Sequence, residues 1–215
     1  MLGFRLPEKI FINLIKEIIM LSKKNFAWVA LMITAPTYAL TPTELTAHLQ
    51  QPSTVQGQFV QQRYLKNITK PMQTSGEFAL KKQVGLYWHV QKPLDLQLRV
   101  RPQGIAQWDK KTWRNSSQSG QAAQVKLFMA VLGGDTQELA KQFNLSVSGS
   151  LKNWTLTLQP KTAIMKQVFE NISIQGDQVV RQVQLREKQG DRTVMTFQNP
   201  KINQTLNPSA ESALK

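Results

Sequence analysis

Cysteine is absent from this chain of 215 residues, and its absence removes several classes of function at once. Without thiols the chain cannot form a disulfide framework, a thiolate metal site or a catalytic thiol. It also has no cysteine that could carry a lipid anchor behind an export signal. We therefore expect the mature protein to be soluble rather than tethered to a membrane.

Residues that commonly serve catalysis are also scarce. His48 has no second ligand four residues further on, and His89, the other histidine, is predicted on the strand face opposite Trp88. The sequence contains no nucleophile elbow, phosphate-binding loop, dinucleotide fingerprint or HExxH motif. We predict two structural histidines, no enzymatic activity, no catalytic residue, no metal site and no cofactor.

The N-terminal apolar run is too short to span a bilayer as a helix. This run, NFAWVALMITA, follows Lys23 and Lys24 and leads to small residues at Thr37 and Ala39. A basic segment, a short apolar segment and small residues before the cut are typical of an export signal. We predict a leader of residues 1–39 cleaved after Ala39, and a single domain of residues 40–215 in the periplasm.

The segment upstream of this run leaves two interpretations open. It is a long basic n-region, or translation starts at Met20 and gives a compact leader. A membrane anchor over residues 10–35 is disfavoured because four charged residues interrupt it, each at a cost of about 2.5–3.5 kcal/mol near a helix centre.

Acidic residues are few relative to basic ones. The chain has 27 Lys and Arg against 13 Asp and Glu, a net charge of +14. Five basic and two acidic residues precede residue 40, which leaves 22 minus 11, or +11, for the rest of the chain. This excess is either a solvated basic surface or a source of attraction to anionic head groups or an acidic partner. Because export is predicted, we expect no nucleic acid as a partner.

The pattern after residue 40 is that of a mainly β protein with three short helices. One helix begins at a capping box formed by Thr41 and Glu44, a second covers 121–132, and a third begins at Asp135. Residues 110–120 and the tail from Asn199 show no regular pattern. About ten strands are predicted, at 55–65, 76–90 (two strands), 94–100, 104–109, 144–150, 153–160, 168–175, 178–187 and 192–198. Short connections between them predict an antiparallel sheet that closes towards a barrel.

Alternate residues of this sheet are apolar and should line one face. In residues 76–93 the row is interrupted by Lys82, and a second row follows over 94–100. Three short helices offer little area to cover so wide a face. The sheet therefore either fills its own interior or leaves a cavity with the helices as a lid, and the residue pattern does not choose between these outcomes. The first row is Phe78, Leu80, Val84, Leu86, Trp88 and Val90, and the second is Leu94, Leu96, Leu98 and Val100.

Several short motifs occur along the chain in a recognisable order. Around the first hairpin they are Gly76-Glu77, Lys81-Lys82-Gln83, Leu86-Tyr87-Trp88 and Pro93. Others are FVQQ (59–62), LGGD…L…F (132–143), WTLTLQP (154–160), FENISI (169–174), GDRTVMTF (190–197) and NQTLNP (203–208). In this order they resemble the LolA family of periplasmic carriers of outer-membrane lipoproteins, and most of all its divergent LolA-like branch, some of whose members are associated with other exported lipids.

The resemblance implies an open antiparallel β-barrel of eleven strands, with three short helices as a lid over an apolar cavity. It implies a soluble periplasmic carrier, expected to be a monomer, that binds acyl chains of lipoproteins or of another exported lipid. Such a carrier would receive its cargo from an inner-membrane donor complex, touch membrane surfaces transiently and deliver to an outer-membrane acceptor. A periplasmic lipid or lipoprotein sensor, or an interaction domain with a filled core, is the alternative.

The resemblance also assigns roles to residues. Lys82 matches the family's arginine, which hydrogen-bonds to lid segments in the closed state, and Leu86 matches a phenylalanine of the cavity wall. Lysine lacks the planar fork of arginine, so we expect a less firmly latched lid or a different latch. The predicted ligand-binding residues are Phe78, Leu80, Val84, Leu86, Trp88, Leu96, Leu98, Trp154 and Leu156, and the predicted lid residues are Phe128, Met129 and Leu132.

Overall fold

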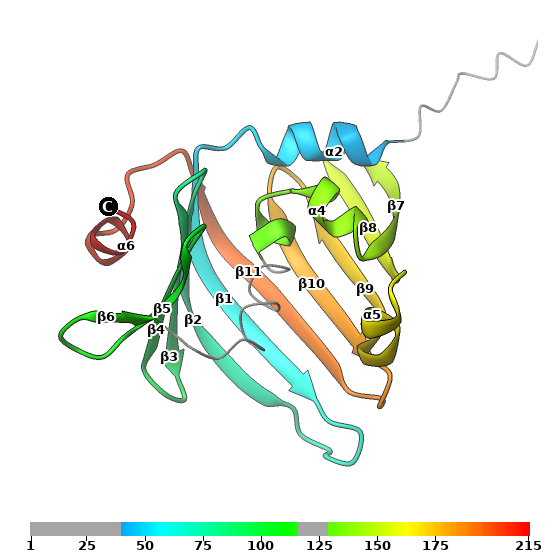
Figure 1. Cartoon of the computed structure of the whole chain (residues 1–215), viewed down its shortest axis with the longest axis horizontal. Helices are drawn as coiled ribbons and strands as arrows, with labels where there is room; N and C mark the ends of the chain where they lie inside the picture. Colours follow the sequence, from blue (N-terminus) through cyan, green and yellow to red (C-terminus); the bar gives the residue numbers. More distant parts are fainter. Residues whose placement is uncertain (1–39, 116–128) are drawn as a thin grey trace, which may run out of the picture. The chain divides into compact units, whose positions relative to one another are not determined.

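One antiparallel sheet dominates the computed structural model, which describes residues 40–115 and 129–215. The sheet has eleven strands in the order β6-β5-β4-β3-β2-β1-β11-β10-β9-β8-β7. The first and last strands of the chain therefore pair at its centre, and the two edges, β6 and β7, come from the middle of the chain (Figure 1). The strands are β1 (Thr54–Tyr64), β2 (Met72–Lys81), β3 (Gly85–Lys92), β4 (Leu96–Arg101), β5 (Gly104–Trp108), β6 (Trp113–Asn115), β7 (Phe143–Ser150), β8 (Asn153–Pro160), β9 (Phe169–Gly176), β10 (Val180–Glu187) and β11 (Arg192–Ile202).

Within the described residues, four short helices accompany the sheet: α2 (Pro42–Leu49), α4 (Thr136–Ala140), α5 (Ala163–Val168) and α6 (Pro208–Ala213). Residues 129–132 are also helical. In the part of the chain that the structure describes, no helix is long and apolar enough to cross a membrane. The predicted export signal and residues 121–128, including Phe128, lie outside the described residues.

The predicted fold class is confirmed: the protein is mainly β, with one open antiparallel sheet and a few short helices. The capping box predicted at Thr41 and Glu44 is also confirmed, at the start of α2. At α4 the Asp135 side chain accepts a hydrogen bond from the Glu138 amide. These capping contacts satisfy amides that the first turn of a helix leaves free.

Three elements were missed, and each has a physical reason. Strand β6 has three residues, too few to show an alternating pattern. Helix α5 has only six residues and none of them is fully buried, so it is too short to show a clear helical period in the sequence. The tail from Asn199 is regular rather than irregular, because β11 continues to Ile202 and α6 follows, with Asn207 as its N-cap and Pro208 in its first turn.

The inner face of the sheet buries one large apolar core. At its centre the rings of Phe59 and Trp88 stack with centroids 3.8 Å apart, and Phe78 meets the edge of Phe197 at 5.1 Å. These four rings come from β1, β3, β2 and β11, so they join the first strands of the domain to its last. Full burial of one such side chain contributes about 1.5–3 kcal/mol to the free energy of folding. This aromatic cluster therefore stabilises the packing of β1, β2 and β3 against β11.

Each of the two predicted apolar rows needs one correction. Phe78, Leu80, Leu86, Trp88 and Val90 do share the inner face, with Phe78 opposite Trp88 and Leu80 opposite Leu86. The prediction that Val84 continues this row is wrong, because residues 82–84 form the β2–β3 turn. Val84 packs instead with Ala79 and Tyr87, on the other face. In the second row Leu94 is not part of β4 but lies in the turn before it, where it is 75% exposed.

The C-terminal helix covers the outer face of β2 and β3. Leu206, Ala210 and Leu214 pack there against Ala79 and Tyr87. The Tyr87 hydroxyl donates to the Gln97 side chain at 3.2 Å. Burial, together with the nearby carboxylates of Glu77 and Asp95, raises the pKa of Tyr87 to about 12. The hairpin that borders the site described below is thus supported from behind by the end of the chain.

Gly76 provides a test of this sheet. It lies where the β2–β3 register shifts, and a β-carbon there would come within 1.8 Å of the His89 carbonyl oxygen. Gly76→Ala should force the two strands apart and lower the free energy of unfolding by about 2–3 kcal/mol, as measured by urea unfolding followed by tryptophan fluorescence.

The neighbouring Ser75→Ala substitution is the control, and it should change the free energy of unfolding by less than about 0.5 kcal/mol. Equal urea midpoints for Gly76→Ala and the parent chain would show that β2 and β3 do not approach as closely as described.

Candidate functional site

Helix α2 lies over one end of the curved sheet and is held on both sides (Figure 1). On one side the His48 Nε2 donates to the Asp177 carbonyl oxygen at 2.8 Å, and the Trp154 indole donates to the same oxygen at 2.7 Å. On the other side the Lys82 Nζ donates to the Gln50 carbonyl oxygen at 2.6 Å. Helix α2 therefore connects the β9–β10 turn to the β2–β3 turn.

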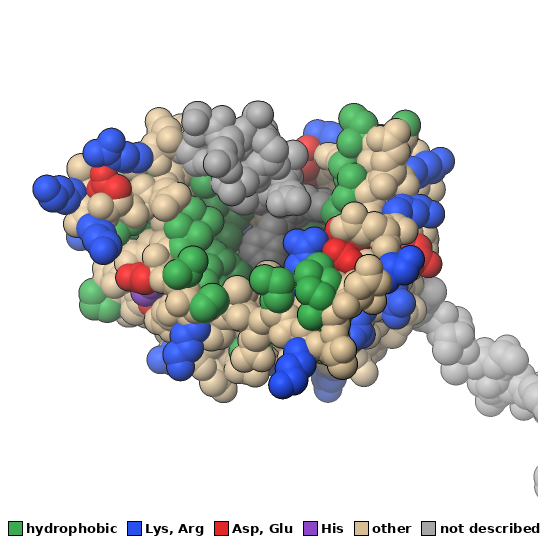
Figure 2. Space-filling view, turned by 90° about the horizontal axis from the view of Figure 1, so that it is seen from below, with side chains coloured by type: hydrophobic (Ala, Val, Ile, Leu, Met, Phe, Trp, Pro, Cys, Tyr) green, Lys and Arg blue, Asp and Glu red, His purple; other side chains and the backbone are tan. Residues whose placement is uncertain are grey.

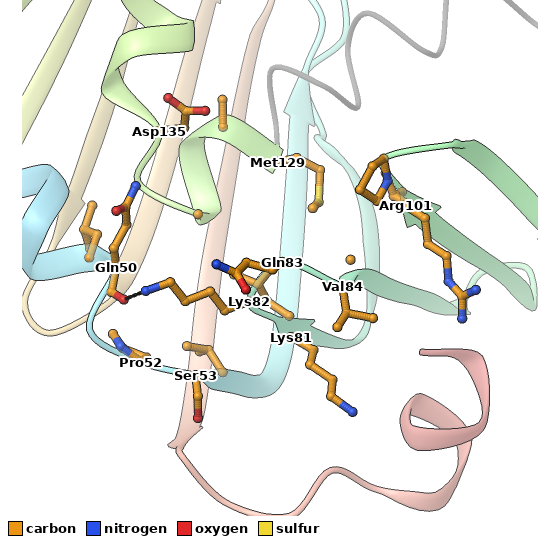
Figure 3. A pocket seen from close by; sticks show the side chains of 18 of the residues that line it. Gln50, Pro52, Ser53, Lys81, Lys82, Gln83, Val84, Arg101, Met129 and Asp135 are labelled. Carbon is orange, nitrogen blue, oxygen red and sulfur yellow. Dashed lines mark hydrogen bonds between the residues drawn. The ribbon is translucent and has the colours of Figure 1, made fainter. Parts of the chain in front are cut away.

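A cavity of about 600 Å³ opens beside this helix. Its walls are the end of α2, the β2–β3 turn, the start of the β4–β5 turn and residues 129–135, as Figure 3 shows. The volume falls within the about 300–1,000 Å³ typical of small-molecule sites. Apolar side chains line part of it, namely Leu49, Val55, Leu80, Val84, Val100, Met129 and Ala130.

Charged residues also line the cavity. Lys82, Asp135 and Glu138 are three of them, whereas Lys81 and Arg101 contribute to the lining while their side chains extend towards α6 (Figure 3). The cations are engaged by acceptors of the protein itself. Beyond the Lys82 contact, Lys81 lies 3.6 Å from Glu211, and the Arg101 Nη2 donates to the carbonyl oxygens of Ala213, at 2.9 Å, and Lys215. The cavity thus combines an apolar wall with a polar edge, which suits an amphiphile better than a fully apolar ligand.

The contact between Lys82 and α2 has a clear electrostatic basis. Gln50 is the C-cap of α2, and carbonyl oxygens at a helix C-terminus carry partial negative charge. The Lys82 backbone is also fixed, because its amide donates to the Ser53 carbonyl oxygen at 2.9 Å. Both groups of the Lys82–Gln50 pair are exposed, so the contact can be broken at little cost.

A second contact joins α2 to the neighbouring helix. The hydroxyls of Thr46 and Thr136 share a hydrogen bond, and Leu139 of α4 is buried with Leu45 and Leu49 of α2. Helix α2, residues 129–132 and α4 therefore lie together over the α2 end of the sheet. These are the three regions in which helices were predicted.

The predicted site residues divide into three groups. Leu80, Lys82, Val84 and Met129 line the cavity. Phe78 and Leu132 border a narrower gap of about 10 Å³ that shares Leu80 with it. The others lie on the inner face without lining the cavity: Leu86, Trp154 and Leu156 are buried in the core, Trp88 packs against it, and Leu96 and Leu98 are half-buried opposite Val90 and Trp88.

Several lining residues were not predicted. Val100 ends the row of Leu96 and Leu98, and Leu49 is an apolar residue of the first helix, so both could have been found from periodicity. Arg101 and Glu138 had no such signal, because their position depends on how turns far apart in sequence come together.

The two histidines do not form a common site. His48 holds α2, whereas His89 lies between carboxylates, with Nδ1 3.3 Å from Glu77 and Nε2 2.7 Å from Asp95. Within residues 40–115 and 129–215, no group of three or more His, Asp or Glu side chains is arranged to hold a metal ion.

Comparison with known proteins relates this chain to one protein family. Residues 50–210 match the family model of the outer membrane lipoprotein carrier protein LolA. The chain is similar to two proteins named outer-membrane lipoprotein carrier protein. The one from Pseudomonas entomophila is 23% identical over 75% of this chain and 78% of the relative. The one from Azotobacter vinelandii is 25% identical over 82% of this chain and 88% of the relative.

Among solved structures, a LolA superfamily protein from Nitrosomonas europaea superposes with a TM-score of 0.47 and 8% identity, covering 82% of this chain and 98% of that one. The family match covers well over half of the chain and confirms the resemblance seen in the order of its motifs. This chain therefore belongs to the LolA family, whose members are carrier proteins and not enzymes.

Proposed function

We propose that this protein is a soluble periplasmic carrier that binds acyl chains of lipoproteins, or of another exported lipid, beneath α2 and moves them towards the outer membrane. The observation that carries the proposal is the cavity of about 600 Å³ between the end of α2, the β2–β3 turn and residues 129–135. Apolar side chains line its wall, and charged side chains lie at its edge. The family match and the relatives named as lipoprotein carriers support the same function.

The energetics of acyl chains explain why such a protein is needed. Exposing a chain to water costs about 0.8 kcal/mol for each CH₂ group. A chain of about fifteen such groups therefore costs about 12 kcal/mol, which prevents its free diffusion between membranes. A carrier must replace the membrane interior with an apolar wall and must also release the chain at its destination.

The contacts of α2 suit a lid that opens. Its links to the rest of the domain include single hydrogen bonds from Lys82, His48 and Thr46. Each such bond contributes about 0.5–1.5 kcal/mol, so one can be exchanged without unfolding the sheet. The proposed lid comprises α2, α4 and residues 129–132, with Met129 and Leu132 on its apolar side and Lys82 as its latch. Phe128 remains a prediction.

The cavity as it stands is small for several acyl chains, so we propose that it widens when the lid moves. Leu80 and Val84 already line it. The wider wall would include the inner-face residues Phe78, Leu86, Trp88, Leu96, Leu98, Trp154 and Leu156, which share that face of the sheet or pair with it.

The proposed carrier function also includes export to the periplasm and two membrane-bound partners. The leader of residues 1–39 would direct the chain to the periplasm and be removed after Ala39. A donor complex at the inner membrane and an acceptor at the outer membrane would load and unload a monomeric carrier. The basic excess of the chain after residue 40 is compatible with brief contact with anionic surfaces.

Leu80 tests the cavity. Leu80→Glu places a carboxylate on the apolar wall and should weaken the binding of an apolar fluorescent probe at least about tenfold, because burial of an unpaired charge is costly. The measurement is a titration followed by probe fluorescence, with circular dichroism to verify the fold. Leu151→Glu, at an exposed turn, should bind the probe like the parent chain. A folded Leu80→Glu variant with unchanged affinity would argue against the cavity as the binding site.

Lys82 tests the latch. Lys82→Met removes the hydrogen bond to the Gln50 carbonyl and should speed probe uptake about two- to tenfold in stopped-flow fluorescence, since a bond worth about 0.5–1.5 kcal/mol no longer opposes opening. Lys82→Arg should restore slow uptake, and Lys152→Met serves as a charge-matched control in a turn. If Lys82→Met took up the probe at the parent rate, Lys82 would have no part in closing the lid.

A further inference from the structure

Exposed hydrophobic side chains are concentrated at one end of the sheet. Among the described residues, six large hydrophobic side chains are more than two-fifths exposed: Ile68 (52%), Met72 (60%), Leu94 (75%), Leu151 (42%), Ile164 (69%) and Val168 (42%). Five of them lie at the end opposite α2, and we call these five, Ile68, Met72, Leu94, Ile164 and Val168, the apolar rim.

The strand register establishes this grouping. Ile68 lies in the β1–β2 connection and Met72 is the first residue of β2. At this level Arg63 of β1 pairs with Met72 on one side and with Thr193 on the other. Leu94 lies in the β3–β4 turn, beside the start of β2, because Ser75 pairs with Lys92. All these positions are at the end of the sheet where β1 and β3 finish.

Helix α5 lies at the same end. It precedes β9, whose first residue Phe169 pairs with Glu187 at the end of β10, and the Lys188 amide donates to the Val168 carbonyl oxygen at 2.9 Å. Ile164 and Val168 are therefore at the level of the β10–β11 turn. Leu151, in contrast, is in the β7–β8 turn at the other end, because Trp154 pairs with Gly176 beside the β9–β10 turn that holds α2.

The apolar rim follows the curve of the sheet rather than forming one local patch. From β3 to β9 there are five strand spacings in the sheet order, which amount to about 24 Å. In the view onto this end, hydrophobic side chains border a hollow and Lys and Arg side chains lie around them (Figure 2). A surface that contacts all five residues at once would have to be broad.

Lysines accompany the apolar rim in the same connections. Five of them are exposed: Lys66 and Lys70 between β1 and β2, Lys92 at the end of β3, Lys166 in α5 and Lys188 between β10 and β11. Nearby carboxylates already have partners, since Asp95 contacts His89 while Glu187 and Asp191 contact Arg63. Glu170 is a further exposed carboxylate at the start of β9. The charge at this end is thus predominantly positive.

We propose that the apolar rim is a docking surface for an anionic phospholipid bilayer. Exposed aliphatic side chains at the tips of several connections can enter the headgroup region, and lysines between them can bind anionic headgroups, each lysine contributing about fivefold in affinity. The proposal deepens the proposed carrier function, on which it rests, because it describes how the carrier is held at a membrane.

Docking by this end keeps the cavity free. The apolar rim and the Lys82–Gln50 contact lie at opposite ends of strands such as β1, which has 11 residues and is therefore about 35 Å long. A docked protein would present α2 and the cavity away from the bilayer, towards a protein partner. Docking and cavity binding can consequently be altered separately.

Vesicle flotation with the chain from residue 40 onward tests the proposal. The parent protein should bind vesicles of phosphatidylglycerol and phosphatidylethanolamine at low salt, and bind vesicles of phosphatidylcholine at least about tenfold less. The double variant Leu94→Glu/Ile164→Glu should lose at least about tenfold in affinity for the anionic vesicles, and Lys70→Glu/Lys166→Glu should lose a similar amount. Leu151→Glu and Lys152→Glu, at the opposite end, should stay within about twofold of the parent.

Probe binding in the cavity, measured on the same variants, separates this proposal from the carrier function. Rim variants that lose vesicle binding but retain probe binding support docking by the apolar rim. If vesicle binding persists in the rim variants, or falls equally in Leu151→Glu, docking by this surface is overturned. A parent chain that binds neither vesicle type overturns it as well, and indicates that any partner of the apolar rim is a protein. A parent chain that binds anionic vesicles but no apolar probe supports docking and contradicts the carrier function.

Discussion

The structure depends on how a single sheet buries one apolar face. Eleven strands with alternating side chains create an inner wall far wider than any of the short helices, and in the described part of the chain there is no second sheet to pack against it. The sheet curves, so that β2 and β3 lie near α2 on one side and β9 and β10 on the other. Phe59, Trp88, Phe78 and Phe197 fill the middle of the curve, where β1 and β11 pair.

Filling the centre leaves the two ends with different properties. At the α2 end the aromatic cluster gives way to smaller side chains such as Val55, Leu80 and Val100, and a cavity remains between them and the helices. The helices there are held by buried leucines, Leu45 and Leu139 among them, and by hydrogen bonds from His48 and Lys82 to carbonyl oxygens. The hydrogen bonds can be exchanged for bonds to water, and an acyl chain that enters the cavity can offer new apolar contact to the helices, so this end can bind a chain and still release it.

At the other end the strands finish in turns whose aliphatic tips point to solvent rather than into the core. Leu94 and Ile164 are more than two-thirds exposed in a domain that otherwise buries its large apolar residues well. Exposed residues of this kind, repeated across several connections and accompanied by lysines, are more consistent with a surface that contacts a partner than with isolated surface residues. The separation of the two ends would allow one to hold the carrier at a membrane while the other exchanges cargo.

How far the sequence predicts this arrangement is clear from particular residues. Periodicity placed Phe78, Leu80, Leu86 and Trp88 on one inner face because side chains in strands alternate. It failed at Val84, since a turn of three residues preserves the even-numbered spacing and hides the reversal of the chain. Capping signals located α2 and α4, but the same kind of signal at Asn207 and Pro208 was overlooked in a tail of polar composition.

The sequence by itself determined ten of the eleven strands, the capping of the first helix, the absence of thiol chemistry and the family, because these follow from local pattern and from the order of motifs. Only the tertiary structure decided that an unfilled cavity remains, that Lys82 contacts the end of α2, and that five exposed aliphatic side chains lie at the same end of the sheet. These features depend on sheet curvature and on contacts between turns more than thirty residues apart, such as that of Lys82 with Gln50. Curvature is a collective property of the packed sheet, and no local pattern of residues records it.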